Sequence, residues 1–485
     1  MITLSSQEET INNMSYRNIF FHFIILTSHM HFFFLVMWKW GQIRLFRKRP
    51  SSFFLQSPLF TEYWFKDFKI HESLKKDLQK LGLSRPTAIQ AKAFVPVSAW
   101  RDATLCSQTG SGKTIAYLLP LLNRALIQQD HKPESLGYDL LGRCSAPAVV
   151  LCPTVELCRQ VLSVAALLDS ENRISKQTLA DLNMKNVMNG PRIRWGGVDL
   201  VVSTPAKFAQ DIDRFKDDLL KPSTVVLDEA DMLLEGASRD SVMEILNYLR
   251  PIPKKIIKDI SSESPPTRPP CQFVFVSATI PRIGNNTAGP MIDDRFGTAE
   301  MVQAGNFHAI PSNINSVEWV PELQGNWEHR CYLLTQLLQP LVDAEQRILV
   351  FVNSGKNVSA LFEFLKEKKW PVKKFSAAGD SHDGQIVVAT DLAARGIDWT
   401  GIDTVVNFQM PTDVVTWIHR AGRCGRIGRT GSVVSFYKEK EEGLVCLIKE
   451  RVAENLPLED LFSHKRSLRR KSVLDHPSSK IERGS

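Results

Sequence analysis

The segment Ser107–Thr114, which reads SQTGSGKT, restricts the possible folds of this chain more than any other stretch. Two glycines followed by Lys113 and Thr114 are typical of a loop that leaves a β-strand, wraps its backbone N–H groups around phosphates and enters a helix. We expect Lys113 to reach the outer phosphates of ATP and Thr114 to bind Mg²⁺. The predicted cofactor contacts are Ser107, Gln108, Thr109, Gly110, Ser111, Gly112, Lys113 and Thr114.

A second signal is the acidic segment Asp228–Asp231, which reads DEAD and follows the apolar run Thr224–Leu227. A carboxylate at the end of a buried strand can hold Mg²⁺ through water, and the next one can orient an attacking water. Asp228 and Glu229 are therefore predicted to act with Lys113 in ATP hydrolysis. Two solvated acids at the start of a helix, favoured by the helix dipole, are the alternative.

The rest of the chain alternates short apolar runs with helical stretches, which is typical of an α/β fold with parallel sheets flanked by helices. Ile70–Leu83 has helical apolar spacing and reaches a stop signal at Gly82. The predicted strands are Ala148–Cys152, Asp199–Ser203, Thr224–Leu227, Phe273–Ser277, Ile348–Asn353, Gln385–Thr390 and Thr404–Phe408.

The chain has 485 residues, a net charge of +8 and a sequence pI near 9.0. This length allows two or three domains, and the charge favours a nucleic-acid or anionic-membrane partner, or else a solvated basic surface. The 8 cysteines are scattered and form no CxxC pair. Free thiols are expected rather than a metal site.

The amino-terminal segment contains no Asp or Glu between Glu9 and Glu62, and Ile19–Trp38 is almost entirely apolar. From Met37 the sequence becomes rich in arginine, serine and aromatic residues, a composition typical of a mitochondrial presequence. A disordered basic tail and a membrane anchor are alternatives, and translation starting at Met37 is another.

Further motifs appear in a fixed order along the chain. Arg85–Gln90 reads RPTAIQ with Phe65 upstream, Ser277–Thr279 reads SAT, and His419–Arg426 reads HRAGRCGR. Thr390-Asp391 and Gly396-Ile397-Asp398 lie between the last two of these motifs. With the phosphate loop and DEAD, these segments make the chain resemble the DEAD-box family of RNA-dependent ATPases, from Phe65 to about Leu461.

The resemblance implies two tandem RecA-like domains that close around ATP and single-stranded RNA. Gln90 would read the adenine edge, with Phe65 near it, and Asp398 would hold the ribose. Arg423 and Arg426 would be arginine fingers, because a planar guanidinium can meet the charge that spreads over the γ-phosphate. His419 would bridge to the SAT and DEAD segments, and Ser277, Ala278 and Thr279 would couple hydrolysis to RNA separation. The implied RNA contacts, mainly to the backbone, are Pro153, Thr154, Thr204, Pro205, Asn353 and Thr390.

The predicted organisation is a targeting or basic leader (1–61), a first domain (62–300), a linker (301–325), a second domain (326–463) and a basic tail (464–485). Within the family, the leader and the tail resemble those of mitochondrial members linked to assembly of the large ribosomal subunit. The expected partner is therefore ribosomal RNA or its precursor, bound by a monomer without a stable membrane partner. A nuclear, nucleolar or cytoplasmic location is the alternative.

Several positions depart from the family pattern. Val155 and Lys207 each stand in place of an arginine, and Gln409 stands in place of an acid. Leu83 occupies a position that is often aromatic, and Trp417 stands in place of a tyrosine. Gly196-Gly197 lies too close to the next predicted strand to serve as the family's double-glycine motif.

The largest departure follows Gly379, where a helix with a Q-x-x-R motif is missing. A crossover between parallel strands needs about 10–12 residues, helix included. The shortened connection is expected to leave apolar sheet surface bare. An alternative splice product, a gene-model error and a degenerate domain each explain it. The expected function is that of an ATP-dependent RNA helicase or RNP remodeller. The missing helix makes an RNA-binding assembly factor with little unwinding a competing function, and a DNA helicase is a third possibility.

Overall fold

The computed structural model describes residues 60–130, 147–179, 198–212, 221–251, 271–282, 287–305, 308–311, 313–322, 326–375, 384–391, 401–425, 429–454 and 456–461. The predicted leader, the basic tail, most of the proline-rich stretch 251–270, the Gly196-Gly197 pair, Asp398 and Arg426 lie outside these ranges. The described part forms two α/β domains, each built on one parallel sheet. No helix in these ranges is long and apolar enough to cross a bilayer.

The first domain contains a sheet in the order β3-β4-β2-β5-β6-β1-β7, in which all neighbouring strands run parallel. Its strands are β1 (Ala103–Ser107), β2 (Ala148–Leu151), β3 (Lys176–Thr178), β4 (Leu200–Ser203), β5 (Thr224–Asp228), β6 (Gln272–Ser277) and β7 (Glu300–Ala304). Its helices are α3 (Glu72–Lys80), α4 (Ala88–Ser98), α5 (Lys113–Asp130), α6 (Val155–Leu168), α7 (Pro205–Asp211), α8 (Ala230–Glu235), α9 (Arg239–Leu249) and α10 (Ala288–Arg295).

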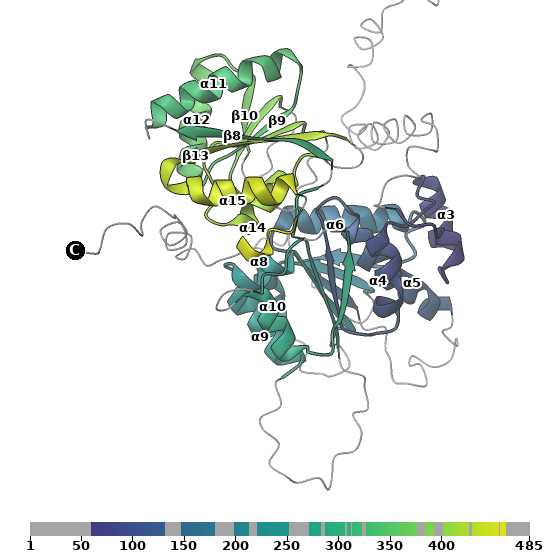
Figure 1. Cartoon of the computed structure of the whole chain (residues 1–485). Helices are drawn as coiled ribbons and strands as arrows, with labels where there is room; N and C mark the ends of the chain where they lie inside the picture. The colour runs from purple at the N-terminus through teal and green to yellow at the C-terminus, as the bar shows by residue number, and fades with distance from the viewer. Residues whose placement is uncertain are drawn as a thin grey trace, which may run out of the picture. The chain divides into compact units, whose positions relative to one another are not determined.

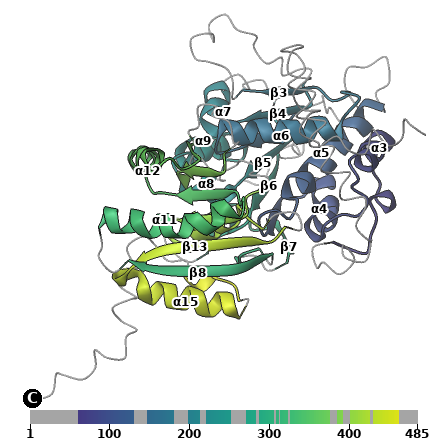
Figure 2. The same cartoon turned by 90° about the horizontal axis from the view of Figure 1, so that it is seen from above.

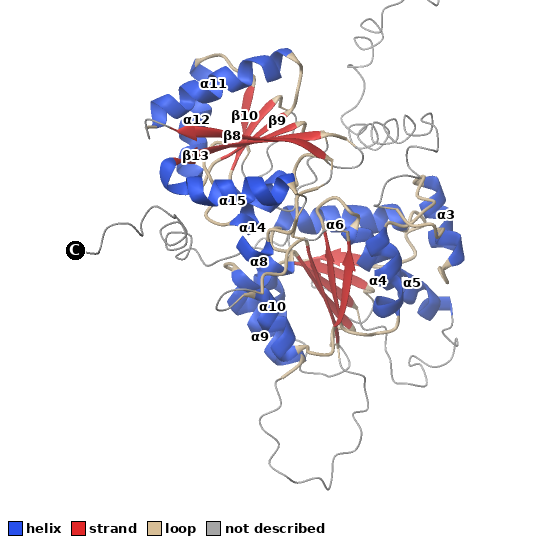
Figure 3. Cartoon of the chain, viewed as in Figure 1, coloured by secondary structure: helices blue, strands red, loops and turns tan. Residues whose placement is uncertain are grey.

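Helices cover both faces of this sheet, as Figures 1 and 3 show for α4 and α5 on one side and α8, α9 and α10 on the other. The alternation along β2 explains how one strand serves two cores. Val150 packs into the cluster formed with α3 to α6, whereas Val149 and Leu151 pack into the cluster with α7 to α10. A strand buried on both faces must be apolar at every position, and this is why the central strands were predictable.

The second domain contains a parallel sheet in the order β10-β11-β9-β12-β13-β8. Its strands are β8 (Ile314–Glu322), β9 (Ile348–Phe351), β10 (Val372–Lys374), β11 (Ile386–Ala389), β12 (Thr404–Asn407) and β13 (Gly431–Lys438). Its helices are α11 (Trp327–Asp343), α12 (Gly355–Glu367), α14 (Val414–Ala421) and α15 (Glu442–Ala453). Figure 2 shows β8 and β13 side by side, with α11 on one face and α15 on the other.

The α/β prediction is confirmed, and all seven predicted strands are present with ends shifted by no more than two residues. The predicted helix at Ile70–Leu83 corresponds to α3, and Gly82 beyond it has a φ of 73°. The seven cysteines in the described ranges are free thiols, as expected.

The stretch predicted as a linker, 301–325, is largely strand. β7 completes the edge of the first sheet, and β8 forms the edge of the second, so the connection is only residues 305–313. These edge strands are partly solvent-exposed and carry polar residues, and therefore lack the continuous apolar pattern of central strands. Before Glu62, Phe60 already pairs with Thr87 across an isolated bridge.

The short connection after β10 does not expose an apolar sheet face, so that expectation was wrong. β10 pairs in parallel with β11, and Val372 points to the face covered by α11 and α12. On the opposite face β10 contributes Lys373, whose side chain is exposed. Phe375 beyond the strand is 5% exposed and packs into the core. The stem of Lys373 lies beside Gly384, where an added Cβ would be 3.2 Å from it.

Candidate nucleotide and RNA site

The first domain gathers its predicted site residues at the carboxyl ends of three neighbouring strands. β5, β6 and β1 are adjacent in the sheet, and they end at Asp228, Ser277 and Ser107. In an open α/β sheet, ligands bind in the crevice beyond the carboxyl ends of the strands. The phosphate loop, the DEAD segment and the SAT segment therefore meet at one edge, although they are far apart in sequence.

The phosphate loop takes backbone conformations that favour glycine and is held against Gln90. Gly110 and Gly112 have φ values of 75° and 86°. The side-chain amide of Gln90 donates to the carbonyl oxygen of Gly112 at 3.2 Å, and a Cβ at Gly112 would approach that amide nitrogen to 2.4 Å. The other end of the Gln90 amide accepts from the backbone N–H of Thr87 at 2.9 Å. Gln90 thus closes the start of α4 and fixes the loop.

Lys113 lies at the start of α5 and bends back over the loop. Its ammonium donates to the carbonyl oxygens of Ser107 at 2.8 Å and Gln108 at 3.0 Å. The hydroxyls of Ser107 and Ser111 lie 2.6 Å apart across the turn. Glycines with positive φ, a helix start and a lysine at the loop form the arrangement expected for phosphates.

Asp228 is buried and shares a hydrogen bond with a residue that the sequence did not reveal. The hydroxyl of Tyr117 on α5 donates to Asp228 Oδ2 at 2.8 Å, and Asp228 is only 5% exposed. Burial and the neighbouring Glu229 raise the pKa of Asp228 to about 7. A cation nearby would favour its ionised form. Tyr117 sits one helical turn after Lys113, and that spacing is the only signal the sequence contains.

Glu229 occupies a strained backbone position between β5 and α8. Its φ and ψ are 55° and 54°, in the left-handed region that non-glycine residues rarely adopt. Its Oε2 atom is buried and accepts no hydrogen bond from the described residues, and it lies 4.0 Å from Nδ1 of His419. Strain of this kind tends to persist where it serves a function.

A buried network joins the DEAD segment, the SAT segment and the second domain. Nε2 of His419 on α14 lies 2.8 Å from Asp231 Oδ2 and 3.3 Å from the hydroxyl of Thr279. Thr279 also donates to the same carboxylate oxygen. Burial opposes ionisation of Asp231, but His419 and Thr279 hold its pKa well below the usual range. Asp231 was not singled out from the sequence, although it contacts both coupling partners.

The segment that follows α14 brings the second domain to the phosphate loop. Arg423 is 3% exposed, and its Nε donates to the carbonyl oxygen of His419 at 3.3 Å. Gly422 lies directly against the side chain of Thr109. A Cβ added at Gly422 would be only 2.0 Å from the Thr109 hydroxyl oxygen. Arg426 and Asp398 lie outside the described residues.

Replacing Gly422 with Ala is therefore expected to lower ATP turnover at least about tenfold, since the added methyl collides with Thr109. The variant should keep the thermal stability of the wild-type protein within about 1 kcal/mol, because the collision is relieved when the two segments separate. Steady-state ATPase assays with a thermal melt test this. Wild-type turnover in the variant would contradict the close approach, and Gly355→Ala, an exposed position where nothing lies within 4 Å of an added Cβ, is the control for glycine replacement.

The predicted RNA contacts fall at carboxyl ends of strands in both sheets. Pro153 and Thr154 follow β2, and Thr204 and Pro205 follow β4. Asn353 follows β9 and Thr390 follows β11.

Hydrogen bonds within the protein hold several of these predicted RNA contacts in place. Thr154 caps α6 by accepting from the N–H of Leu157 at 3.2 Å. The oxygen of the Asn353 amide accepts from Arg420 at 2.7 Å, and Arg420 also binds Asp391 through Nε at 2.5 Å. Gln409, which stands where the family has an acid, accepts from the N–H of Asn353 at 2.8 Å.

Two other residues, the predicted cofactor contact Phe65 and the departure Trp417, contribute to packing. Phe65 is 5% exposed and belongs to the core, and its backbone N–H donates to the carbonyl of Ser84 at 3.1 Å. Trp417 is fully buried, stacks on Trp319 with ring centroids 5.5 Å apart and donates to the Ser435 hydroxyl. Trp417 therefore fills a core position.

Comparisons with known proteins agree with this arrangement. Residues 87–286 match the family model described as "DEAD/DEAH box helicase", and residues 330–428 match "Helicase conserved C-terminal domain". Together the two models match more than half of the chain. The chain is 28% identical over 418 residues to "ATP-dependent RNA helicase DBP2" of Lodderomyces elongisporus, covering 82% of this chain and 68% of that protein.

Two solved structures have the same fold. The first is "S. cerevisiae Dbp5 bound to RNA and ADP BeF3", with a TM-score of 0.62 and 22% identity over 85% of this chain and 98% of the other. The second is "DEAD-box helicase Mss116 bound to ssRNA and UDP-BeF", with a TM-score of 0.65 and 18% identity over 85% and 83%. The order of motifs, the two parallel sheets and the matched family models lead to one conclusion: the chain belongs to the DEAD-box family of ATP-dependent RNA helicases.

Proposed function

We propose that this chain uses ATP hydrolysis to rearrange RNA duplexes or protein–RNA complexes. The observation that supports it best is the network of Asp231, Thr279 and His419, in which groups from both domains share one carboxylate. The nucleotide edge is the edge of the first sheet where β5, β6 and β1 have their carboxyl ends. A group in this position can respond both to a nucleotide bound at that edge and to movement of the second domain. RNA binding and ATP turnover would then be linked by domain closure.

The residues at the nucleotide edge fit ATP with Mg²⁺. The loop glycines allow backbone N–H groups to face phosphates, Lys113 adds a positive charge, and Asp228 and Glu229 offer carboxylate oxygens. The bound nucleotide would supply the phosphoanhydride bond, and the metal would neutralise its oxygens. Thr114 at the start of α5 and Asp228, through water, would hold the metal.

The chain's own groups would then divide the work of hydrolysis. Glu229 would orient the attacking water and accept its proton, since its buried Oε2 is not used by any described residue. Arg423 would stabilise the charge on the γ-phosphate oxygens, with Arg426 as a second finger. The hydroxyl of Tyr117 would fix the orientation of Asp228.

Separation of a short RNA duplex by the full chain tests this function. ATP should support strand separation, whereas the complex with a non-hydrolysable analogue should bind RNA without repeated turnover. Lys113→Ala should abolish separation, and Lys92→Ala, which removes an exposed hydrogen bond from the same domain, should not. No ATP-dependent separation by a protein with RNA-stimulated ATPase activity would contradict the proposal.

A second candidate is an RNA-binding assembly factor with little unwinding. Only residues 375–385 connect β10 to β11, and they contain neither a Q-x-x-R motif nor any arginine, so the family's RNA-contacting arginine has no counterpart there. RNA retention that is sensitive to salt and largely independent of ATP would favour this candidate. Efficient strand separation would rule it out.

We further propose mitochondrial ribosomal RNA, or its precursor, as the substrate. The acid-free, arginine-rich stretch that follows Met37 supports this location. A fluorescent protein fused to the carboxyl terminus of the full chain should accumulate in mitochondria. Accumulation in the nucleus, nucleolus or cytoplasm would contradict the location and leave the RNA-dependent activity to be judged separately.

A further inference from the structure

His308 lies in the short connection between the two sheets and is enclosed on every side. It falls between the end of β7 and the start of β8, with a backbone φ of 61°. Its side chain is 0% exposed. A polar ring buried this completely needs partners for its nitrogen atoms, and those partners come from distant parts of the chain.

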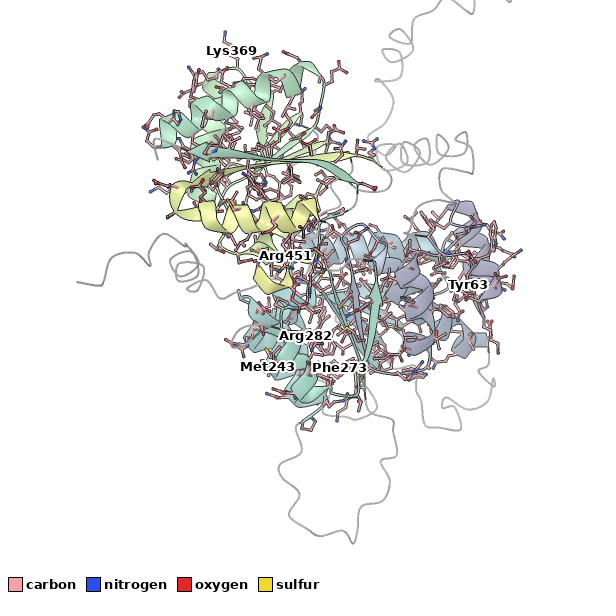
Figure 4. The ribbon with its side chains drawn as sticks, in the orientation of Figure 1. Tyr63, Met243, Phe273, Arg282, Lys369 and Arg451 are labelled. Carbon is pink, nitrogen blue, oxygen red and sulfur yellow. The ribbon has the colours of Figure 1, made fainter. Side chains whose placement is uncertain are left out.

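One face of His308 contacts the first domain next to the SAT segment. Nε2 accepts from the backbone N–H of Ile280 at 2.9 Å. Ile280 directly follows Ser277–Thr279, whose threonine binds Asp231 and His419. Figure 4 labels Arg282, two residues further on, in the first domain. Because Nε2 accepts a hydrogen bond, the neutral ring carries its proton on Nδ1.

The other face of His308 contacts the carboxyl-terminal segment of the second domain, Leu458–Leu461. Nδ1 lies 3.1 Å from Oε2 of Glu459, and the carbonyl oxygen of His308 accepts from the N–H of Leu458 at 2.8 Å. Leu458 and Leu461 pack into the core cluster of the second domain. The segment therefore moves with that domain.

We propose that His308 is a positioning residue, a clamp through which the carboxyl-terminal segment of the second domain fixes the backbone that follows the SAT segment. This inference rests on the proposed function, because it assumes that Ser277–Thr279 couples hydrolysis to RNA. When the second domain moves, Leu458 and Glu459 move with it, and the ring that accepts from Ile280 is displaced. The clamp thus makes the SAT segment respond to the second domain by a route independent of His419.

Two replacements divide the functions of the ring. His308→Gln can place an amide oxygen near the position of Nε2 and keep the acceptor for Ile280, but it loses the contact with Glu459. His308→Asn keeps a polar group near the position of Nδ1 and loses the acceptor for Ile280. Glu459→Ala breaks the clamp from the other side, at a residue whose side chain is 28% exposed. Glu454→Ala, an exposed acid just beyond α15, is the matched control.

RNA-stimulated and RNA-free ATP turnover of the full chain measure the coupling. His308→Asn and Glu459→Ala should each lower the maximal RNA stimulation about fivefold or more, with RNA-free turnover unchanged. The RNA concentration for half-maximal stimulation should also stay unchanged, because neither residue is a predicted RNA contact. The double replacement should be no worse than the single ones, since both break one clamp. Glu454→Ala should behave as wild type.

Wild-type stimulation in Glu459→Ala and in either His308 variant would overturn the clamp while leaving the proposed function intact. Strictly additive losses of stimulation in the double variant would also overturn the clamp. Absence of RNA stimulation in the wild-type protein would instead overturn the proposed function and the clamp with it. If the His308 variants fail to fold, Glu459→Ala and hydrogen exchange at the Ile280 amide decide the matter. Exchange there should be faster in Glu459→Ala than in Glu454→Ala, and equal rates contradict the clamp.

The pH dependence gives an independent readout. Burial lowers the pKa of His308 below its ordinary value of 6.5, against the opposing effects of Glu459 and Asp231, and Arg282 adds to the lowering. The folded protein therefore favours the neutral ring. The ring's contribution to the stability of the clamp is complete above pH 6.5 and is lost as the pH falls from 6.5 through the lowered pKa of the folded state. RNA stimulation should decline on acidification more steeply in the wild-type protein than in His308→Gln, whose amide does not titrate. Identical profiles would contradict the role of the ring.

Discussion

Replacing Glu229 with Gln is expected to reduce ATP turnover by a factor of about 10²–10⁴, the range typical for loss of a general base. Gln keeps the volume of the side chain and one acceptor oxygen, but its neutral amide cannot take a proton from water. The strained conformation at φ 55° belongs to the connection between β5 and α8 and does not depend on the carboxylate. The fold should therefore persist.

Nucleotide binding should survive this replacement, because Lys113 and the loop glycines are unchanged. Single-turnover hydrolysis and binding of a fluorescent nucleotide analogue separate the two effects. Asp240→Asn, which removes an exposed acid from α9 in the same domain, is the control for loss of charge. A turnover loss of less than about tenfold in Glu229→Gln would contradict its assignment as the base.

Replacing Arg423 with Ala is expected to lower turnover by about 10³–10⁵, the effect associated with an arginine finger. Arg423 is 3% exposed and lies next to His419 and Gly422, close to where Gly422 approaches Thr109 of the phosphate loop. A methyl group cannot meet the charge that develops on the γ-phosphate oxygens. Lys should recover little, because an ammonium lacks the planar fork of a guanidinium.

Arg423→Ala should leave nucleotide binding by the first domain nearly unchanged, since the phosphate loop belongs to that domain alone. Lys369→Ala removes one positive charge from an exposed position at the far end of the second domain (Figure 4) and should have no effect. Equal ATP turnover in Arg423→Ala and in the wild-type protein would show that hydrolysis does not need Arg423.

The sequence predicted the central strands of both sheets because these strands are buried on both faces. Val225 and Val405, for example, are fully buried, and all the other residues of their strands β5 and β12 are buried as well. Edge strands have no such pattern. β10 carries Lys373 and Lys374 and is recognised only by its pairing with β11.

The candidate site was predictable where chemistry demands fixed spacing. Gly110, Gly112 and Lys113 must follow one another to surround phosphates, and Asp228 and Glu229 must end a strand. The partners that come from other elements were not predictable. Tyr117 and His308 reach Asp228 and Ile280 only through the fold, since no local pattern distinguishes them from ordinary core residues.

The measurement that tests the account most directly is ATP hydrolysis by the full chain with and without single-stranded RNA, compared with DNA of the same sequence. We predict that RNA raises turnover at least tenfold, that DNA does not, and that Glu229→Gln and Arg423→Ala abolish the stimulated rate, because RNA binding across both domains brings the second domain onto the nucleotide edge. ATP turnover that is the same with RNA, with DNA and with neither would contradict the account.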